Sequence, residues 1–347
     1  MTIAELVDIR RFRLVEGAPP APGPGEVLAR VEAVGICGSD LHNFMEGGIG
    51  DAVAVYPMVL GHEPTGVVVE CGHGVTGWAP GDRVVLEPAI YCYHCEFCLS
   101  GRHNVCSNLR FMSVAPDPGY FRQFVTLPAA NLLPLPAGMG FDEGTVFEPL
   151  AVALHSLTFA DVKLGETVAV FGAGPIGLLT VAAVKLAGAR MVLVVEPVAH
   201  RREMAKAMGA DEVFDASEPV QAVLGATRGR GVDVAIDCAA KEDTINQCLH
   251  VTRNAGRVVI TGIPSEVKIP LEFHVLRRKE IRFYNVRRSN HTSELALELM
   301  AEKPHLFAPL VTHARGLDDV QGAFELLERY GDGVGKIVLR PQGGVSM

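Results

Sequence analysis

The sequence predicts an α/β protein with two domains. Both ends of the chain form a β-rich, barrel-like domain, and a doubly wound parallel sheet is inserted between them. The first 150 residues carry short valine-rich runs punctuated by Gly and Pro, which is typical of short strands. From about residue 155, apolar strands alternate with helices, which indicates a parallel sheet. We expect the first domain to comprise residues 1–154 and 289–347, and the second 155–288.

The elements of the first domain follow from local patterns of apolar residues. Alternating or continuous Val and Leu predict strands, and apolar residues at helical spacing predict helices near the C-terminus. The final strand is assigned to the first domain. The predicted strands are 26–31, 66–70, 82–86 and 336–339, and the predicted helices are 293–300 and 317–330.

The inserted domain shows a regular alternation. Its strands are almost continuously Val, Ile and Leu, as expected for strands covered on both faces. Each early strand is followed by a helical segment. The predicted strands are 168–171, 191–195, 213–214, 232–236 and 257–261, and the predicted helices are 178–186 and 200–208.

Composition excludes several classes of protein. Lys and Arg total 31 and Asp and Glu total 40, so the net charge is −9. A negative chain with scattered basic residues does not favour binding to nucleic acid. There is no apolar run of about 18 residues and no pattern typical of a signal peptide, so we expect a cytoplasmic protein without a membrane partner.

Four cysteines form the densest chemical motif. Cys92, Cys95, Cys98 and Cys106 suit tetrahedral zinc, which binds thiolates and orders loops that lack a core of their own. A closed site of four thiolates has no open position, so it predicts a structural zinc lobe over 91–107. A disulfide framework is the alternative, but that is typical of small secreted chains.

A glycine-rich turn predicts a dinucleotide site. Gly172, Gly174 and Gly177 follow a predicted strand and open a predicted helix, and Pro175 and Ile176 lie between them. The first glycine permits a tight turn, the second permits close approach of a pyrophosphate, and the third permits close packing of helix and strand. The amino end of the helix then faces the phosphates.

Residues after the later strands refine the cofactor. Glu196 ends the second strand, where a carboxylate accepts hydrogen bonds from a ribose diol and repels a 2′-phosphate, which favours NAD over NADP. Arg201 and Arg202 favour the opposite choice if they face that phosphate; otherwise they lie on a solvated helix face. Gly262 and Ile263 follow a later strand and are expected near the nicotinamide.

A second group of donors lies in separate segments. Cys37, His62 and Glu148 are individually ambiguous, because a lone cysteine is usually a core residue and a lone histidine usually forms a local hydrogen bond. Together they supply thiolate, imidazole and carboxylate. Zinc accepts this set and keeps one position for a substrate, so the three predict a catalytic zinc site.

With these motifs in place, the chain resembles the zinc-dependent medium-chain alcohol dehydrogenases. The matching segments are GHEPTGVVVECGHGV at 61–75, GDRV at 81–84, the four-cysteine lobe, and GAGPIG at 172–177. The resemblance implies a GroES-like catalytic domain, a Rossmann domain, two zinc ions and NAD. It also implies a homo-oligomer, a dimer or a tetramer, with homotetramer as our expectation.

The resemblance assigns two zinc ligands directly, Cys37 and His62. Glu148 stands where many members have a second cysteine, and this departure resembles the polyol (sorbitol-type) and threonine dehydrogenase branch. In that branch Glu63 can also be a ligand. Whether Glu63 or Glu148 completes the zinc shell stays open, because Glu63 can equally act by orienting His62.

The family also implies catalytic and pocket residues. Ser39 would accept the substrate proton and pass it through a ribose hydroxyl to His42, with Glu148 beside the reacting group. Phe44 and Phe111 would line the substrate pocket.

Arg287 is expected to bind the substrate or the cofactor, unless it is simply a surface cation. The leading hypothesis is an NAD- and zinc-dependent dehydrogenase of a secondary alcohol, such as a polyol, sugar alcohol or cyclitol. Alternatives are an amino-alcohol dehydrogenase of the threonine type, a zinc-free quinone or enone reductase, and a non-catalytic nucleotide-binding or structural protein.

Overall fold

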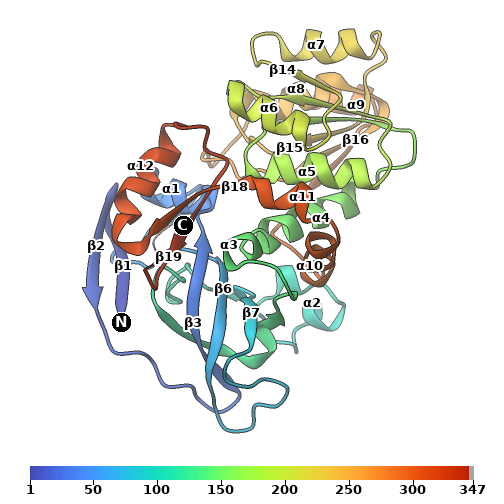
Figure 1. Ribbon diagram of the computed structural model, residues 1–347. Helices are drawn as coiled ribbons and strands as arrows, with labels where there is room; N and C mark the ends of the chain where they lie inside the picture. The colour runs from blue at the N-terminus through green and yellow to red at the C-terminus, as the bar shows by residue number, and fades with distance from the viewer. Residues whose placement is uncertain (344–347) are drawn as a thin grey trace. The chain divides into compact units, whose positions relative to one another are not determined.

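The computed structural model describes residues 1–343, and the chain divides into two compact units (Figure 1). Met1–Glu148 and the chain from Ser293 onward form the first unit, and Pro149–Thr292 form the second. The sequence placed the boundaries after residue 154 and after residue 288. The first boundary lies inside helix α4 (Phe147–Ala160), so no turn marks it in the sequence.

The largest sheet of the first unit is built around strand β3 (Glu26–Gly35). This strand pairs antiparallel with β6 (Glu63–Cys71) and with β19 (Lys336–Arg340), so the C-terminal part of the chain returns to the first unit. In the same sheet lie β7 (Arg83–Leu86), β10 (Phe124–Pro128), β11 (Leu132–Pro134) and β18 (Val311–Gly316).

Helices and short hairpins complete the first unit. They are β1 (Thr2–Asp8), β2 (Arg11–Glu16), α1 (Gly38–Glu46), β4 (Gly48–Ile49), β5 (Ala52–Val53), β8 (Ala89–Ile90), α2 (Glu96–Leu99), η1 (His103–Val105), β9 (Arg110–Phe111), η2 (Ala129–Asn131), α3 (Phe141–Gly144), α10 (Ser293–Glu302), α11 (Pro304–Phe307), η3 (Ala308–Leu310), η4 (Leu317–Asp319) and α12 (Val320–Glu328).

The predicted helix over 317–330 is wrong in extent. The segment starts with the 3₁₀ turn η4, and only α12 is α-helical. The helix ends at Glu328 because Tyr330 takes a left-handed backbone conformation, with φ of 49°, which a right-handed helix does not accept. The predicted strands of this unit are confirmed, although β3 and β6 extend beyond the predicted residues.

The second unit contains a parallel sheet in the strand order β14-β13-β12-β15-β16-β17 over its described residues. The strands at its centre, β12 (Thr167–Phe171) and β15 (Val232–Asp237), are buried along their whole length, which explains why most of their residues are apolar. The other strands are β13 (Met191–Val195), β14 (Glu212–Phe214), β16 (Thr252–Ile260) and β17 (Arg282–Asn285).

Helices connect the parallel strands of the second unit. Helix α5 (Pro175–Leu186) packs on β12 and β13, and α8 (Glu242–Val251) packs on β15 and β16. The remaining helices are α6 (Ala199–Ala207), α7 (Pro219–Ala226) and α9 (Phe273–Arg278). The predicted doubly wound sheet is confirmed. Strand β17 was missed because its residues are partly exposed and lack a continuous apolar run.

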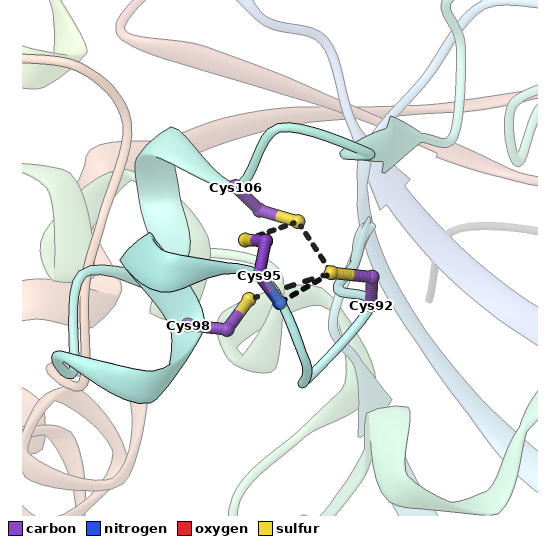
Figure 2. Close-up of side chains that lie close together, drawn as sticks. All are labelled: Cys92, Cys95, Cys98 and Cys106. Atoms are coloured by element: carbon purple, nitrogen blue, oxygen red, sulfur yellow. Dashed lines mark hydrogen bonds between the residues drawn. The ribbon is translucent and has the colours of Figure 1, made fainter.

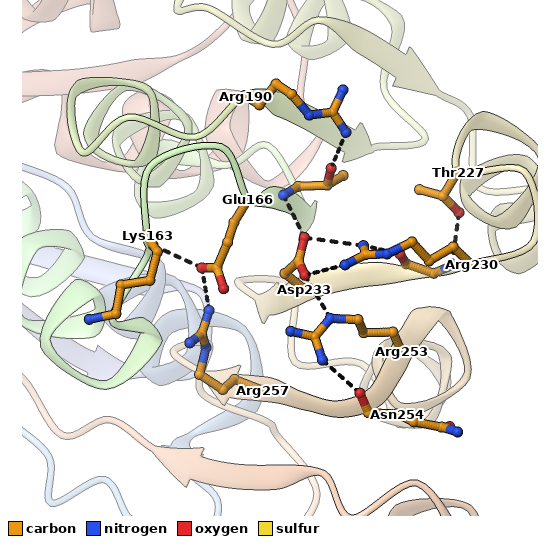
Figure 3. A network of polar contacts seen from close by, with 11 residues as sticks. Lys163, Glu166, Arg190, Thr227, Arg230, Asp233, Arg253, Asn254 and Arg257 are labelled. Carbon is orange, nitrogen blue, oxygen red and sulfur yellow. Dashed lines mark hydrogen bonds and ion pairs between the residues drawn. The ribbon is translucent and has the colours of Figure 1, made fainter.

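Ion pairs and hydrogen bonds of charged residues join the amino ends of neighbouring strands in this sheet (Figure 3). Asp233 at the start of β15 accepts hydrogen bonds from Arg253 Nε at 2.6 Å, Arg230 Nη2 at 2.7 Å and the backbone N–H of Thr167 at 2.9 Å. These donors hold the pKa of Asp233 well below its usual range, although burial of the carboxyl opposes them. The carboxylate thus ties β15 to β12 and to the start of β16.

Among residues 1–343, no helix combines the length and apolarity needed to cross a lipid bilayer.

We predict that D233N lowers the free energy of unfolding of the second unit by about 1–3 kcal/mol, because charge-assisted hydrogen bonds are lost from a buried site. The folded-state pKa is lowered, so the stabilisation is present above the unfolded-state pKa of about 3.9 and is lost as pH falls. The difference from wild type should therefore shrink below about pH 5. Urea unfolding at several pH values measures this.

E203Q is the matched control for D233N, because Glu203 pairs with Lys206 on an exposed surface. An exposed ion pair contributes at most about 1 kcal/mol. Equal stability of D233N and wild type at neutral pH would contradict the structural role of Asp233.

Candidate metal and cofactor sites

Four sulfur atoms converge in the lobe around helix α2 (Figure 2). Cys106 Sγ lies 3.5 Å from Cys92 Sγ and 3.8 Å from Cys95 Sγ, and Cys92 Sγ lies 4.0 Å from Cys98 Sγ. A tetrahedral zinc ion with bonds of about 2.3 Å to sulfur gives sulfur–sulfur edges of about 3.8 Å. The cage therefore fits zinc in size, and all eight cysteines, including these four, are free of disulfides.

Electrostatics in the lobe also favour a cation. Hydrogen bonds from backbone N–H groups, that of His94 first, lower the pKa of Cys92 to about 5. Burial, together with hydrogen bonds to the neighbouring cysteines, raises the pKa of Cys98 to about 12. Four thiolates therefore do not coexist there without a bound cation, which zinc supplies.

A second donor set lies at the end of the central strands of the first unit. Cys37 is the N-cap of helix α1, His62 directly precedes β6, and Glu63 is the first residue of β6. One ligand atom from each lies within 4.8 Å of the others. The sequence reasoning named all three residues, and the structure brings them together.

His62 is held by hydrogen-bonding partners. Its Nδ1 lies 3.2 Å from Ser113 Oγ and 3.4 Å from Asp40 Oδ1, and its Nε2 lies 3.4 Å from Ser39 Oγ. Burial opposes protonation of the imidazole, but the negative charges of Asp40 and Cys37 outweigh burial and raise the pKa of His62 well above its ordinary value. The surroundings of His62 thus favour positive charge.

Asp40 has a structural role at this site. It accepts hydrogen bonds from the backbone N–H groups of Cys37 and Gly61, both at 3.1 Å, so it fixes the residue before α1 and the residue before His62 together. The sequence did not indicate Ser113 as a partner of His62. Ser113 lies 51 residues from His62 in the chain, and no local pattern could indicate the contact.

The carboxylate of Glu63 supports a metal at this position. The side chain is completely buried, and neither oxygen forms a hydrogen bond of normal geometry with any described residue. Oε2 forms an ion pair with Lys336 Nζ, which leaves Oε1 without a polar partner in the described structure. A buried oxygen without a partner is costly, and a metal ion would satisfy it.

Glu148 lies in the first turn of α4 and is buried, but it is outside the compact donor set of Cys37, His62 and Glu63. Burial raises its pKa to about 7; Glu63 adds to the rise, while His62 and Lys336 oppose it. These couplings place Glu148 in the electrostatic surroundings of the donor set.

Two more predicted residues lie on helix α1. Ser39 is in contact with His62, as described above. His42 Nδ1 lies 3.1 Å from Glu46 Oε2, and the His42 side chain is partly exposed. A partly exposed histidine one turn after Ser39 is suitable for exchanging protons with solvent.

The structure places the predicted pocket residues in different surroundings. The Phe111 ring centroid lies 5.5 Å from that of His62, so Phe111 is beside the donor set. Phe44 is fully buried and packs against Phe12 and Phe324 in the hydrophobic core, so its assignment to the substrate pocket is wrong. Phe44 belongs to the core because it lies on the face of α1 that is turned inward. Arg287 is an exposed residue of the second unit.

The glycine turn of the second unit has the geometry that its sequence predicts. Gly172 has φ of +89°, which favours glycine, and a side-chain carbon on Gly177 would lie 1.9 Å from the Gly172 carbonyl oxygen. Gly174 caps helix α5 and Pro175 is its first residue. A side-chain carbon on Gly174 would meet only Arg201 Nη1, at 4.0 Å, so the backbone there is open to a ligand.

The residues expected around the cofactor occupy the carboxyl ends of the parallel strands. Glu196 follows β13 and accepts hydrogen bonds from the N–H groups of Ala173 at 2.6 Å and Val198 at 2.8 Å. Its carboxylate is therefore oriented by the glycine turn. Arg202 donates instead to the carbonyl oxygen of Glu196 at 2.7 Å, and Arg201 is buried.

Asp237 holds the backbone of Gly262 at the carboxyl edge of the parallel sheet. Its carbonyl oxygen accepts the N–H of Gly262 at 3.0 Å, and Ile263 beyond it is 52% exposed. The sequence reasoning did not name Asp237. It directly follows the predicted strand 232–236 and is the last residue of β15, and that position was the available signal.

Comparison with known proteins identifies the family. Residues 23–137 match the model of the alcohol dehydrogenase GroES-like domain, and residues 175–302 match that of the zinc-binding dehydrogenases. A sorbitol dehydrogenase of Gallus gallus is 38% identical over 334 residues, covering 95% of this chain and 93% of that protein. An L-idonate 5-dehydrogenase of Vitis vinifera is 34% identical, covering 95% and 92%.

Solved structures agree with this result. A protein of Sinorhizobium meliloti 1021, described as a zinc-binding dehydrogenase and bound to NADP, superposes with a TM-score of 0.89 at 31% identity, covering 98% of this chain and 99% of that one. The chain therefore belongs to the zinc-dependent medium-chain alcohol dehydrogenases and is an oxidoreductase of their polyol dehydrogenase branch.

Proposed function

We propose that this enzyme oxidises a secondary hydroxyl group of a polyol, sugar alcohol or cyclitol, with NAD as the hydride acceptor. The observation that carries the proposal is the compact set of Cys37, His62 and Glu63, in which one oxygen of the buried Glu63 carboxylate has no polar partner among the described residues. A sulfur, nitrogen and oxygen set suits a catalytic zinc ion that keeps one coordination position open.

The relatives support the choice of substrate class. Those described above carry the names of a sorbitol dehydrogenase and an L-idonate 5-dehydrogenase. Both names denote enzymes of polyhydroxylated compounds. Neither name supports the amino-alcohol alternative or a non-catalytic role.

Each cofactor has a distinct chemical part. When bound, zinc lowers the pKa of a hydroxyl group, and NAD accepts hydride. The protein must then bind and orient the alcohol and remove one proton. Ser39 Oγ, 3.4 Å from His62 Nε2, is the group that takes this proton, and the partly exposed His42 delivers it to solvent. Phe111 supplies an apolar wall beside His62.

The two carboxylates take different roles in this proposal. Glu63 belongs to the compact donor set, so we assign it as the third protein ligand. Glu148 lies outside that set and has a pKa raised to about 7 by burial, so we assign it to hold a water molecule or a proton beside the substrate.

The second unit binds the dinucleotide in this proposal. Gly172, Gly174 and Gly177 place the amino end of α5 against the pyrophosphate, and Glu196 accepts the ribose hydroxyls. Arg201 contributes positive charge near Gly174. Gly262, Ile263 and Arg287 contact the nicotinamide side or the substrate. We further propose that the protein is a cytoplasmic homo-oligomer, a dimer or a tetramer, and that the cysteine lobe is its structural zinc site.

A panel of alcohols tests the proposal. Purified protein should carry two zinc equivalents and reduce NAD with sorbitol, other polyols or cyclitols, measured by nicotinamide absorbance. Threonine and NADP complete the panel. Zinc bound only in the cysteine lobe, or activity with threonine alone, would refute it.

We predict that E148Q lowers kcat by about 10²–10⁴-fold, which is the usual contribution of a positioned acid or base. The amide keeps the size of the side chain but does not exchange a proton. The zinc content and the melting temperature should stay close to wild type. The exposed residue Glu302 supplies the control, E302Q, which should be fully active. Wild-type turnover in E148Q would remove Glu148 from the mechanism.

We predict that E196Q raises the Kd for NADH by about 10–100-fold, because a charge-assisted hydrogen bond to the ribose contributes about 1.5–3 kcal/mol. Discrimination against NADPH should fall in the same variant, since the repelling charge is gone. Titration of nicotinamide fluorescence measures both affinities. E203Q on the neighbouring helix is the control, and an unchanged preference in E196Q would show that Glu196 does not select the cofactor.

A further inference from the structure

Lys336 is a buried cation that no motif of the sequence singled out. It is the first residue of β19, and only 1% of its surface is exposed. Its Nζ forms an ion pair with Glu63 Oε2 and donates a hydrogen bond to the carbonyl oxygen of Ile36 at 3.2 Å. Lysine is almost never fully buried unless it is paired, so this position needs an explanation.

The central sheet creates the contact between residues 273 positions apart in the sequence. Gly35 on β3 is paired with Glu63 on β6 and with Val338 on β19. Lys336 lies two residues before Val338 on the same strand, so the side chains of Lys336 and Val338 project from the same face of the sheet. A side-chain carbon on Gly35 would lie 2.1 Å from Glu63 Oε2 and 2.7 Å from Lys336 Cε. The ion pair therefore occupies the space that glycine leaves free.

The ion pair engages one specific oxygen of Glu63. Oε2 faces Lys336, while Oε1 has no polar partner among the described residues and belongs to the side chain that joins Cys37 and His62 in the donor set. Of the two carboxylate oxygens of Glu63, one therefore binds the ammonium group of Lys336, and the other remains available to a metal ion.

We propose that Lys336 is a positioning residue for the catalytic metal: it holds Oε2 of Glu63, so that Glu63 binds the metal through Oε1 alone. This inference rests on the proposed function, because it concerns the same zinc site. Residues that hydrogen-bond to metal ligands orient those ligands. Loss of such a residue typically weakens metal binding about 10–100-fold. The ammonium group is a compact point charge, which suits contact with a single oxygen.

A purely structural role makes a different prediction. An ion pair that only joins β19 to β6 would change stability and leave the affinity and geometry of the metal site unchanged. Metal affinity and the absorption spectrum of the cobalt-substituted protein separate the two roles, because the spectrum reports on the ligands and their geometry.

The experiment uses the full-length protein with zinc in both sites. K336M keeps a long unbranched side chain and removes the charge, and K336R keeps the charge in a planar group. K185M is the control, because Lys185 pairs with Asp211 at the surface. Zinc equivalents, competition with a chelator and the spectrum after replacement of the weaker-bound zinc by cobalt are measured.

K336M should bind zinc at the second site about 10–100-fold more weakly than wild type, with a shifted cobalt spectrum. Zinc in the cysteine lobe should be retained, which shows that the unit is folded. K336R should have intermediate affinity and its own spectral shift, because a guanidinium group contacts a carboxylate differently. If K336M does not fold, the K336R spectrum decides. Wild-type affinity and spectrum in every folded variant would overturn the inference.

A double-mutant cycle adds a direct test. If Lys336 acts through Glu63, E63Q/K336M should bind zinc no more weakly than E63Q alone. Additive losses would contradict the proposal. Failure of the proposed function is distinguishable, because wild-type protein would then bind zinc only in the cysteine lobe, before any variant is compared.

Discussion

The pairing of β3 with both β6 and β19 is the constraint on which the first unit depends. Cys37 follows the end of β3, and Glu63 begins β6. Lys336 begins β19, which comes from the opposite end of the chain. The three side chains meet only because these strands are adjacent and because Gly35 between them has no side chain. A backbone arrangement therefore determines the electrostatics of the candidate metal site.

In the second unit, the residues proposed to bind the cofactor and the residues that stabilise the sheet lie at opposite ends of the parallel strands. The glycine turn and Glu196 lie at carboxyl ends, where open α/β sheets bind their ligands. Asp233 and its arginine partners lie at the amino ends and join neighbouring strands. Changes at the amino ends can therefore alter stability without touching a residue of the proposed cofactor site.

The sequence revealed those features whose residues are close together in the chain. The cysteine lobe and the glycine turn were predictable because each motif is local, and the parallel strands were predictable because burial on both faces requires continuous apolar residues. Phe44 and Lys336 were not predictable. Their roles depend on contacts between distant segments: Phe44 with Phe324 in the core, and Lys336 with Glu63.

The charges of the first unit explain why a metal ion fits there. The carboxylates of Asp40, Glu63 and Glu148 are buried, and those of Asp40 and Glu148 interact electrostatically with His62. In the described structure Lys336 neutralises part of this charge, and the pKa values of His62 and Glu148 are raised. Both shifts mean that the fold retains protons where negative charge is costly.

A divalent cation bound by the donor set would replace the proton of His62. Metal binding releases protons from its ligands and couples ion affinity to folding. The two donor sets of this unit then differ for a clear physical reason. Four sulfur atoms, three pairs of which lie 3.5–4.0 Å apart, enclose an ion completely. The set of Cys37, His62 and Glu63 supplies three donors, and tetrahedral zinc has four positions, so one remains for the substrate.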